Sequence, residues 1–211
     1  MGCNSFLMQT AYALGFSGEK HESRRFGTLR RGSDGVWVKI LEKEGVEVSH
    51  LRPANSGFLV EWSEYFSTKF AGSPLKNIAL KYNGKNQQGD AMITAKGIEG
   101  GAVYAISPQL RGDIEKNGST VMHLDLRPGI TAQALAQKLP VGLRGKQSLS
   151  TFLKKFGLSP VAINLLREAR TQAELAESSS LELAELIKAV PITLTGTTGI
   201  ARAISTAGGI K

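Results

Sequence analysis

The middle of the chain alternates apolar and polar residues, a pattern typical of β-strands. The alternation is clear over residues 58–62, 78–82 and 121–126, and a shorter apolar run lies at 91–94. Successive side chains of a strand point to opposite faces of a sheet, so each stretch is expected to form a strand with one buried face. Several short strands at this spacing predict a small β-barrel or sandwich.

Two glycine-containing segments punctuate these strands. Asn83-Gly84 directly follows one of them, and both residue types accept a positive φ, so a turn is predicted there. Because the next apolar run begins several residues later, we expect residues 83–90 to form a longer loop than a tight hairpin. The glycine-rich stretch 97–101 then leads into a helix expected at 102–115.

The C-terminal half has helical periodicity instead. Its helix starts are marked by residues whose side chains cap free backbone N–H groups. The expected caps are Thr131, Ser148 or Ser150, and Ser159, which is followed by a proline suited to the first helical position. The last of these helices is expected over 181–190.

Upstream of the strands, apolar residues recur at helical spacing over 36–41, and Gly45 is expected to end that helix. A short strand is expected at 46–48. The whole pattern predicts an α+β chain, with a small β-barrel or sandwich followed by a small helical subdomain.

Composition narrows the classes of function. Cys3 is the only cysteine, which excludes an internal disulfide and a multi-cysteine metal site and leads us to expect a cytoplasmic location. His21, His50 and His123 lie far apart without metal-ligand spacing, so no metal is expected. No apolar run reaches the ~18 residues of a membrane span, so we expect no membrane partner.

The net charge of +8 raises one alternative, a basic β-barrel module that binds nucleic acid. Basic residues concentrate over 141–170, where Glu168 is the only acidic residue. Such a run could contact phosphates, and small β-barrels often bind nucleic acids. No aromatic-rich strand accompanies the run as a stacking platform, however, so nucleic acid is the less favoured partner.

The sequence contains no common catalytic motif that assigns a catalytic residue. It contains no G-x-S-x-G elbow and no G-x-G-x-x-G dinucleotide fingerprint, and residues 142–146 depart from a phosphate loop. The helix start after 97–101 could hold an anion, but Glu99 would repel it, so a tight turn explains these glycines better. The small residues of 203–209 allow either close approach to a flat, bulky group or a flexible end.

A series of segments, taken in order, resembles one known family. They are Gly32-Ser33-Asp34-Gly35 with Trp37, Arg52-Pro53-Ala54-Asn55 with Gly57-Phe58, and the ranges 74–80, 94–107, 144–150, 157–168 and 201–209. The family is the group of bacterial NAD(P)/FAD-dependent flavoproteins that includes BaiN-like and aminoacetone-oxidase-like proteins. The resemblance covers about residues 32–211.

The resemblance implies a two-lobed oxidoreductase. A Rossmann-type domain holds FAD, NAD(P)H is a possible second cofactor, and an insert of a β-barrel and a helical unit covers the flavin next to an unidentified small-molecule substrate. The implied division is 1–50 as an atypical remnant of the FAD domain, 51–128 as the barrel insert, 129–190 as the helical insert and 191–211 as the return segment.

The resemblance also implies flavin neighbours in two places. They are Ser205, Thr206, Ala207, Gly208 and Gly209 in the return segment, and Ser33, Asp34 and Gly35 in the first turn. The family holds the flavin pyrophosphate with a G-x-G-x-x-G turn, which this sequence does not contain. We therefore expect an incomplete flavoprotein that does not bind FAD by itself.

Overall fold

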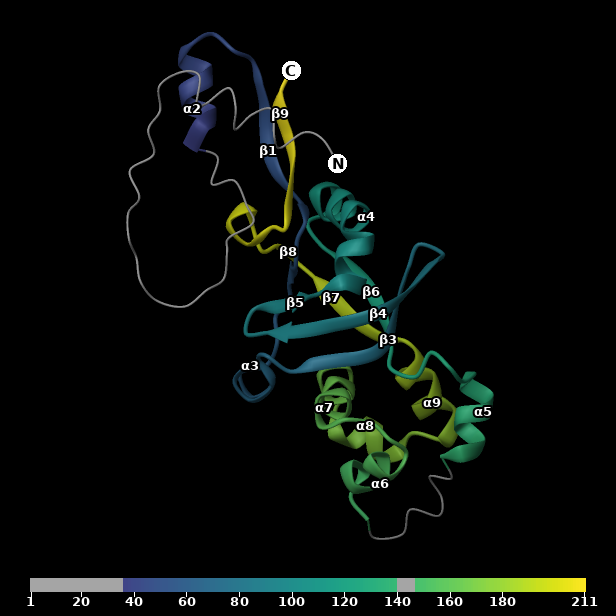
Figure 1. Ribbon diagram of the computed structural model, residues 1–211. Helices are drawn as coiled ribbons and strands as arrows, with labels where there is room; N and C mark the ends of the chain where they lie inside the picture. Colours follow the sequence, from purple (N-terminus) through teal and green to yellow (C-terminus); the bar gives the residue numbers. More distant parts are fainter. Residues whose placement is uncertain (1–35, 140–146) are drawn as a thin grey trace. The chain divides into compact units, whose positions relative to one another are not determined.

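Seven antiparallel strands form the main sheet of the protein. The computed structural model describes residues 36–139 and 147–211, and the sheet lies within them. Its strand order is β7-β6-β3-β4-β5-β2-β8; Figure 1 labels all of these strands except β2. The strands are β2 (Phe58–Leu59), β3 (Pro74–Tyr82), β4 (Lys85–Thr94), β5 (Gly97–Glu99), β6 (Thr120–Asp125), β7 (Val190–Leu194) and β8 (Gly196–Thr197).

The two outer strands of this order are consecutive in the sequence, so the sheet closes into a barrel. Only Thr195 separates β7 from β8, and its backbone N–H donates to the Leu59 carbonyl at 3.1 Å. The segment 190–197 therefore pairs with β6 through its first half and with β2 through its second. The mixed α+β class and the barrel predicted from the sequence are confirmed.

The β3–β4 hairpin is tighter than the sequence predicted. Asn83 and Gly84 have φ values of 45° and 75°, and Tyr82 pairs directly with Lys85. The longer loop expected over 83–90 is therefore wrong. The first half of β4 escaped recognition because its residues are polar and mostly exposed, so they show no apolar alternation.

The strand expected over 58–62 is shorter than predicted and leads into a helix that the pattern did not reveal. β2 ends at Leu59, and α3 (Glu64–Phe70) begins after Ser63, whose side chain caps it. Trp62 therefore lies beyond the end of β2, and its indole N–H donates to the Gly97 carbonyl at 3.1 Å. Trp62 and α3 instead supply a row of tilted aromatic rings, Trp62, Phe66 and Phe70, with neighbouring centroids 4.8 Å and 5.2 Å apart.

The helix predicted at 102–115 is present as α4 (Gly101–Asn117). It packs on several barrel strands and buries one apolar side, including Val103 and Leu110. Gly118, with φ 79°, ends it in the left-handed conformation that favours glycine. Ser107 is also buried and donates to the carbonyls of Val103 and Ser56, which ties the helix to the chain entering β2.

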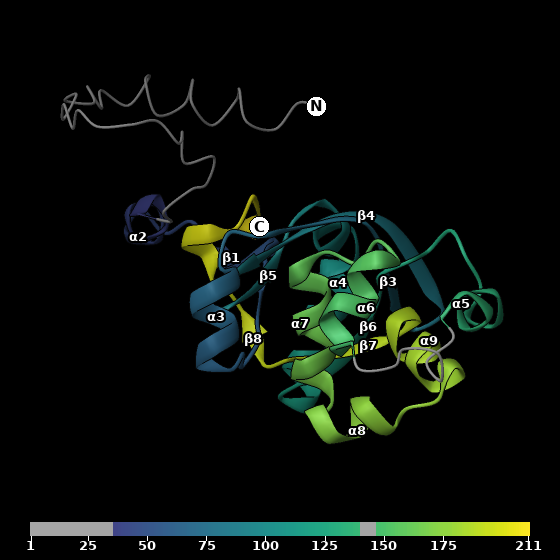
Figure 2. The same ribbon diagram turned by 90° about the horizontal axis from the view of Figure 1, so that it is seen from below.

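In the described residues, the helical subdomain consists of five short helices, which Figure 2 shows grouped together. They are α5 (Ala132–Lys138), α6 (Leu149–Lys155), α7 (Pro160–Ala169), α8 (Gln172–Glu177) and α9 (Ser180–Lys188). The predicted caps Thr131, Ser148 and Ser159 are confirmed. α9 ends two residues earlier than expected, because Val190 already pairs with Leu124 in the barrel.

A separate two-stranded ribbon joins the two ends of the described region. β1 (Val48–Asn55) pairs antiparallel with β9 (Ser205–Ile210), and α2 (Val36–Lys43) precedes β1 (Figure 1). The predicted helix and its end at Gly45 are confirmed. The short strand expected at 46–48 instead starts at Val48 and is much longer.

Candidate functional site

The candidate flavin neighbours of the return segment all lie on one strand of the ribbon. Ser205, Thr206, Ala207, Gly208 and Gly209 belong to β9. The segment is therefore a paired strand, and the alternative of a flexible end is wrong for these residues. The other candidates, Ser33, Asp34 and Gly35, lie outside the described residues.

The two glycines of β9 differ in what surrounds them. Gly208 has φ 100°, and a Cβ placed on it would lie 2.4 Å from the His50 carbonyl oxygen on β1. Close approach of the two ribbon strands alone therefore requires glycine at this position. Gly209 has φ 133°, but a Cβ there would meet nothing within 4 Å, so space remains open beside it.

Polar contacts fix the base of the ribbon, where it meets the barrel. The Ser205 hydroxyl accepts a hydrogen bond from the Asn55 backbone N–H at 3.2 Å, and the Ile204 N–H donates to the Asn55 carbonyl at 2.8 Å. Arg111 of α4 donates to the carbonyls of Pro53 and Ala54, the latter at 3.1 Å. Both ribbon strands are thus held in register at this end.

An ion pair crosses from the barrel to the helical turn η2 (Ile200–Arg202), which precedes β9. Arg202 Nη2 lies 3.4 Å from Glu99 Oε2 at the end of β5. The half-buried Tyr104 lies in the electrostatic field of both groups. Burial, and secondarily the negative charge of Glu99, raises the pKa of Tyr104 above its ordinary value of 10.0, so its phenol keeps its proton at neutral pH.

Two of the three glycines of 97–101, Gly97 and Gly100, are required by backbone packing. A Cβ on Gly97 would lie 1.8 Å from the Phe58 carbonyl oxygen, and one on Gly100, which has φ 119°, would lie 3.0 Å from Ala91 Cα. The tight strand-to-helix turn predicted over 97–101 is confined to Gly100, because 97–99 form β5 and α4 begins at Gly101. The anion-binding alternative has no support from these contacts.

A family comparison decides the relationship of the chain to known proteins. Residues 52–205 match the model described as HI0933-like protein barrel and H2TH domain. This chain belongs to that HI0933-like family. The match confirms the resemblance seen in the sequence, because this is the insert-domain family of BaiN-like and aminoacetone-oxidase-like flavoproteins.

The HI0933-like family is a domain found in FAD-dependent oxidoreductases. Comparison with curated proteins gives no match. Among the helices that the structure describes, none is long and apolar enough to cross a membrane.

The residues of β9 fit a flavin ring better than they fit a flavin diphosphate. β9 pairs only with β1 in the described region, so its other edge leaves backbone N–H and C=O groups unpaired. Its small, partly exposed residues and the open space at Gly209 suit a flat ring system. A diphosphate, in contrast, is held by a glycine turn at a helix start after a parallel strand, and every described strand pair is antiparallel.

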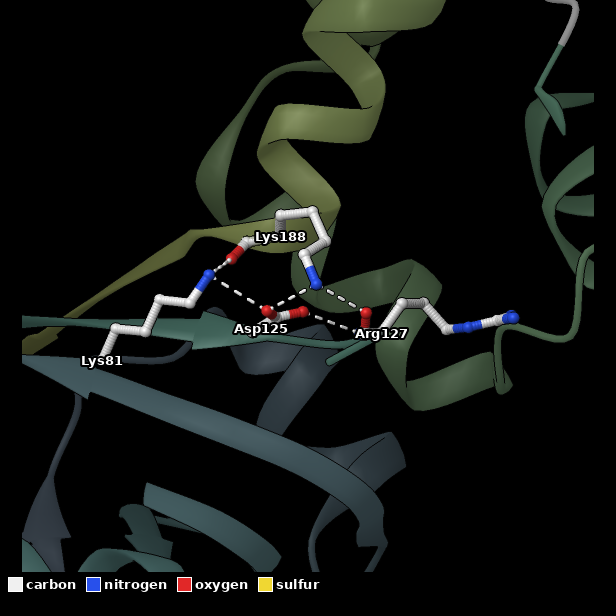
Figure 3. A network of polar contacts seen from close by, with 4 residues as sticks. All are labelled: Lys81, Asp125, Arg127 and Lys188. Atoms are coloured by element: carbon white, nitrogen blue, oxygen red, sulfur yellow. Dashed lines mark hydrogen bonds and ion pairs between the residues drawn. The ribbon is translucent and has the colours of Figure 1, made fainter. Parts of the chain in front are cut away.

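A buried ionic network joins the HI0933-like barrel to its helical unit (Figure 3). The Asp125 side chain, 3% exposed, lies 2.7 Å from Lys188 Nζ and 3.0 Å from Lys81 Nζ. Its other oxygen accepts from the Arg127 backbone N–H at 3.0 Å, and Lys188 also donates to the Arg127 carbonyl at 2.6 Å. No local pattern in the sequence indicates this cluster, because Lys81 and Lys188 come from distant segments.

A second polar contact joins the same two parts. Glu168 of α7 accepts from the Ser63 backbone N–H at 2.8 Å and from the Ser63 hydroxyl at 2.7 Å. The carboxylate therefore completes the cap of α3, a helix of the barrel side. Glu168 was noticed in the sequence only as the acidic exception in a basic run.

The basic run and the histidines do not converge on a common site among the described residues. Lys154 and Lys155 are exposed, while Arg167 donates to Ser150 at 2.7 Å on a neighbouring helix. Part of the run, 141–146, lies outside the described residues. The exposed His50 and His123 lie on different sheets, and no described cluster of three or more residues has the makeup of a metal site.

Proposed function

We propose that this chain forms the barrel-and-H2TH cover of the active site in an FAD-dependent oxidoreductase, with β9 as the strand that faces the flavin. Membership of the HI0933-like family supports the cofactor class. The observation that carries the proposal is β9 itself, an edge strand of Ser205-Thr206-Ala207-Gly208-Gly209 with open space beside Gly209. When bound, FAD supplies the redox chemistry, with NAD(P)H proposed as the electron donor.

In this proposal the chain contributes positioning and shielding. The unpaired edge of β9 donates and accepts backbone hydrogen bonds at the flavin ring, and the barrel excludes water from that face. Tyr104 keeps its proton and can donate a hydrogen bond, while the Glu99–Arg202 ion pair holds η2 in place before β9. Ser33, Asp34 and Gly35 are proposed to approach the flavin from the preceding segment.

We further propose that the chain alone does not form a stable complex with FAD, as the sequence predicts, so that at most weak contacts with the flavin remain. The sequence contains no G-x-G-x-x-G, and the described strands offer no parallel pair that could place one. The proposed division is the one implied by the sequence, with 51–128 and 129–190 covering a flavin that is gripped mainly by a Rossmann-type domain. Residues 1–50 and 191–211 are proposed to lead toward that domain.

Quenching of FAD fluorescence by increasing protein tests this proposal. Thr206→Glu places a negative charge on the proposed flavin-facing strand, and Thr68→Glu places the same charge on the exposed surface of α3. We expect weak binding by the unaltered chain, several-fold weaker binding by Thr206→Glu, and no change with Thr68→Glu. Equal effects of the two variants, or binding that neither affects, would remove β9 from the flavin site.

A further inference from the structure

A basic groove lies on the barrel at the tip of the β3–β4 hairpin. None of the residues that line it belongs to the proposed flavin site. The groove is a shallow, open depression with a volume of about 420 Å³. Its lining residues are Lys81, Tyr82, Asn83, Gly84, Lys85, Asn86, Val121 and His123. None of these is acidic, and five carry side-chain groups that can donate hydrogen bonds to an anion through nitrogen.

The strand register gathers the donors on one face of the sheet. Lys81 pairs with Asn86 on β4 and with His123 on β6, and directly paired residues of antiparallel strands share a face. Lys85 follows at the hairpin turn. The exposed side chains of Lys85 and His123 make no hydrogen bond or ion pair with other described residues, so both are free to meet a ligand.

The charge of Lys81 is only partly compensated, although it belongs to the buried network (Figure 3). Asp125 is shared by two ammonium groups, those of Lys81 and Lys188, so three charged groups sum to one positive charge. The Lys81 side chain remains 39% exposed. Asp113 contacts Tyr82 and Asn83 but is not among the residues that line the groove.

The groove also has an apolar part. Val121, on the same strand as His123, is 43% exposed and lies among the lining residues. We propose that this groove binds a small phosphate monoester, with the phosphate against Lys81, Lys85 and His123 and its organic part against Val121. Charge-assisted hydrogen bonds from several cations to one phosphate are stronger than neutral ones, which favours this ligand class.

Titration of the isotope-labelled chain with phenyl phosphate, at constant ionic strength, tests the proposal by NMR. We expect saturable shifts confined to the amides of 81–86 and 121–123 and to the His123 ring. Lys85→Gln should weaken binding roughly tenfold, because it removes one charge-assisted contact. Lys96→Gln removes an exposed lysine outside the groove and should leave the affinity unchanged.

Two further titrations, with inorganic phosphate and with a short oligonucleotide, test whether the ligand carries an organic group and whether it is small. Val121→Ala should weaken binding of phenyl phosphate while leaving binding of inorganic phosphate unchanged. Shifts spread evenly over surface lysines, equal losses in Lys85→Gln and Lys96→Gln, or much tighter binding of a short oligonucleotide with shifts extending into 154–170 would each overturn the proposal. Because FAD is absent from these titrations, the outcome is independent of the proposed flavin function.

Discussion

The Asp125 carboxylate lies 2.7 Å from the ammonium group of Lys188, at the point where the last helix of the H2TH unit leads into the barrel. Lys188 ends α9, Asp125 ends β6, and both side chains are largely withdrawn from water. Removing a charge from water is costly unless partners replace its hydration. Here one partner, Lys81, comes from the barrel and the other, Lys188, comes from the helical unit. The buried Asp125 carboxylate therefore holds these two parts together.

Replacing Asp125 with Ala is expected to destabilise the fold strongly. The change leaves Lys188 largely buried without its counter-ion, which typically costs about 3–5 kcal/mol. Urea denaturation monitored by circular dichroism gives the free energy of unfolding. The control is Lys76→Ala, since Lys76 pairs with Asp90 but its side chain is 66% exposed, and its midpoint should stay close to that of the unaltered chain. Equal losses in the two variants would contradict the assigned role of the network.

A side chain at Gly97 should disrupt the barrel. The Cβ of Ala at this position would lie 1.8 Å from the Phe58 carbonyl oxygen, so β2 and β5 must separate. We expect a loss of about 3 kcal/mol or more in the free energy of unfolding. Gly101→Ala introduces the same atom at the start of α4, where nothing lies within 4 Å, and should be neutral or slightly stabilising in a thermal melt. A stable Gly97→Ala protein would show that the packing of this barrel is looser than described.

Gly208→Ala should open the ribbon and leave the barrel folded. Its Cβ would lie 2.4 Å from the His50 carbonyl, whereas the Cβ of Gly209→Ala meets no atom within 4 Å. Both changes strain a positive φ, so only the contact with β1 distinguishes them. Hydrogen exchange should show faster exchange of β1 and β9 amides in Gly208→Ala than in Gly209→Ala, with β3 and β6 unchanged in both. Loss of protection in β3 or β6 would mean that the ribbon and barrel unfold together.

Alkaline pH should destabilise the protein through Tyr82. Burial first, and then the hydrogen bond to Asp113, raises the pKa of Tyr82 above its ordinary value of 10.0. The folded state therefore favours the neutral phenol, so this stabilisation is complete below pH 10.0 and is lost as the pH rises through the folded pKa. Urea midpoints measured on the alkaline side should fall more steeply for the unaltered chain than for Tyr82→Phe. Parallel falls would assign the alkaline loss to other groups.

Local signals in the sequence predicted local structure well. Ser159-Pro160 marked the start of α7 because capping and a fixed proline φ act within one helical turn. Asn83-Gly84 marked the hairpin turn for the same reason. The polar half of β4 was missed, because its strand conformation comes from pairing with β3 and not from its own apolar pattern.

The candidate site shows the same limit. The sequence placed Ser205 to Gly209 in one small-residue segment, but the partner strand β1 lies about 150 residues earlier, and no local pattern reports that pairing. The contact between Glu99 and Arg202 and the network around Asp125 are likewise long-range. Family resemblance supplied what periodicity could not, namely the association of these segments with a flavoprotein.

An NMR titration of the isotope-labelled chain with FAD shows most directly whether β9 faces the flavin. We expect weak binding, with the largest amide shifts on β9 at Ser205–Ile210 and smaller shifts near Glu99 and Tyr104. Unmoved β9 signals, with shifts elsewhere, would contradict the assignment of this strand as flavin-facing. A tight stoichiometric complex would contradict the claim that the chain covers the flavin without gripping its diphosphate.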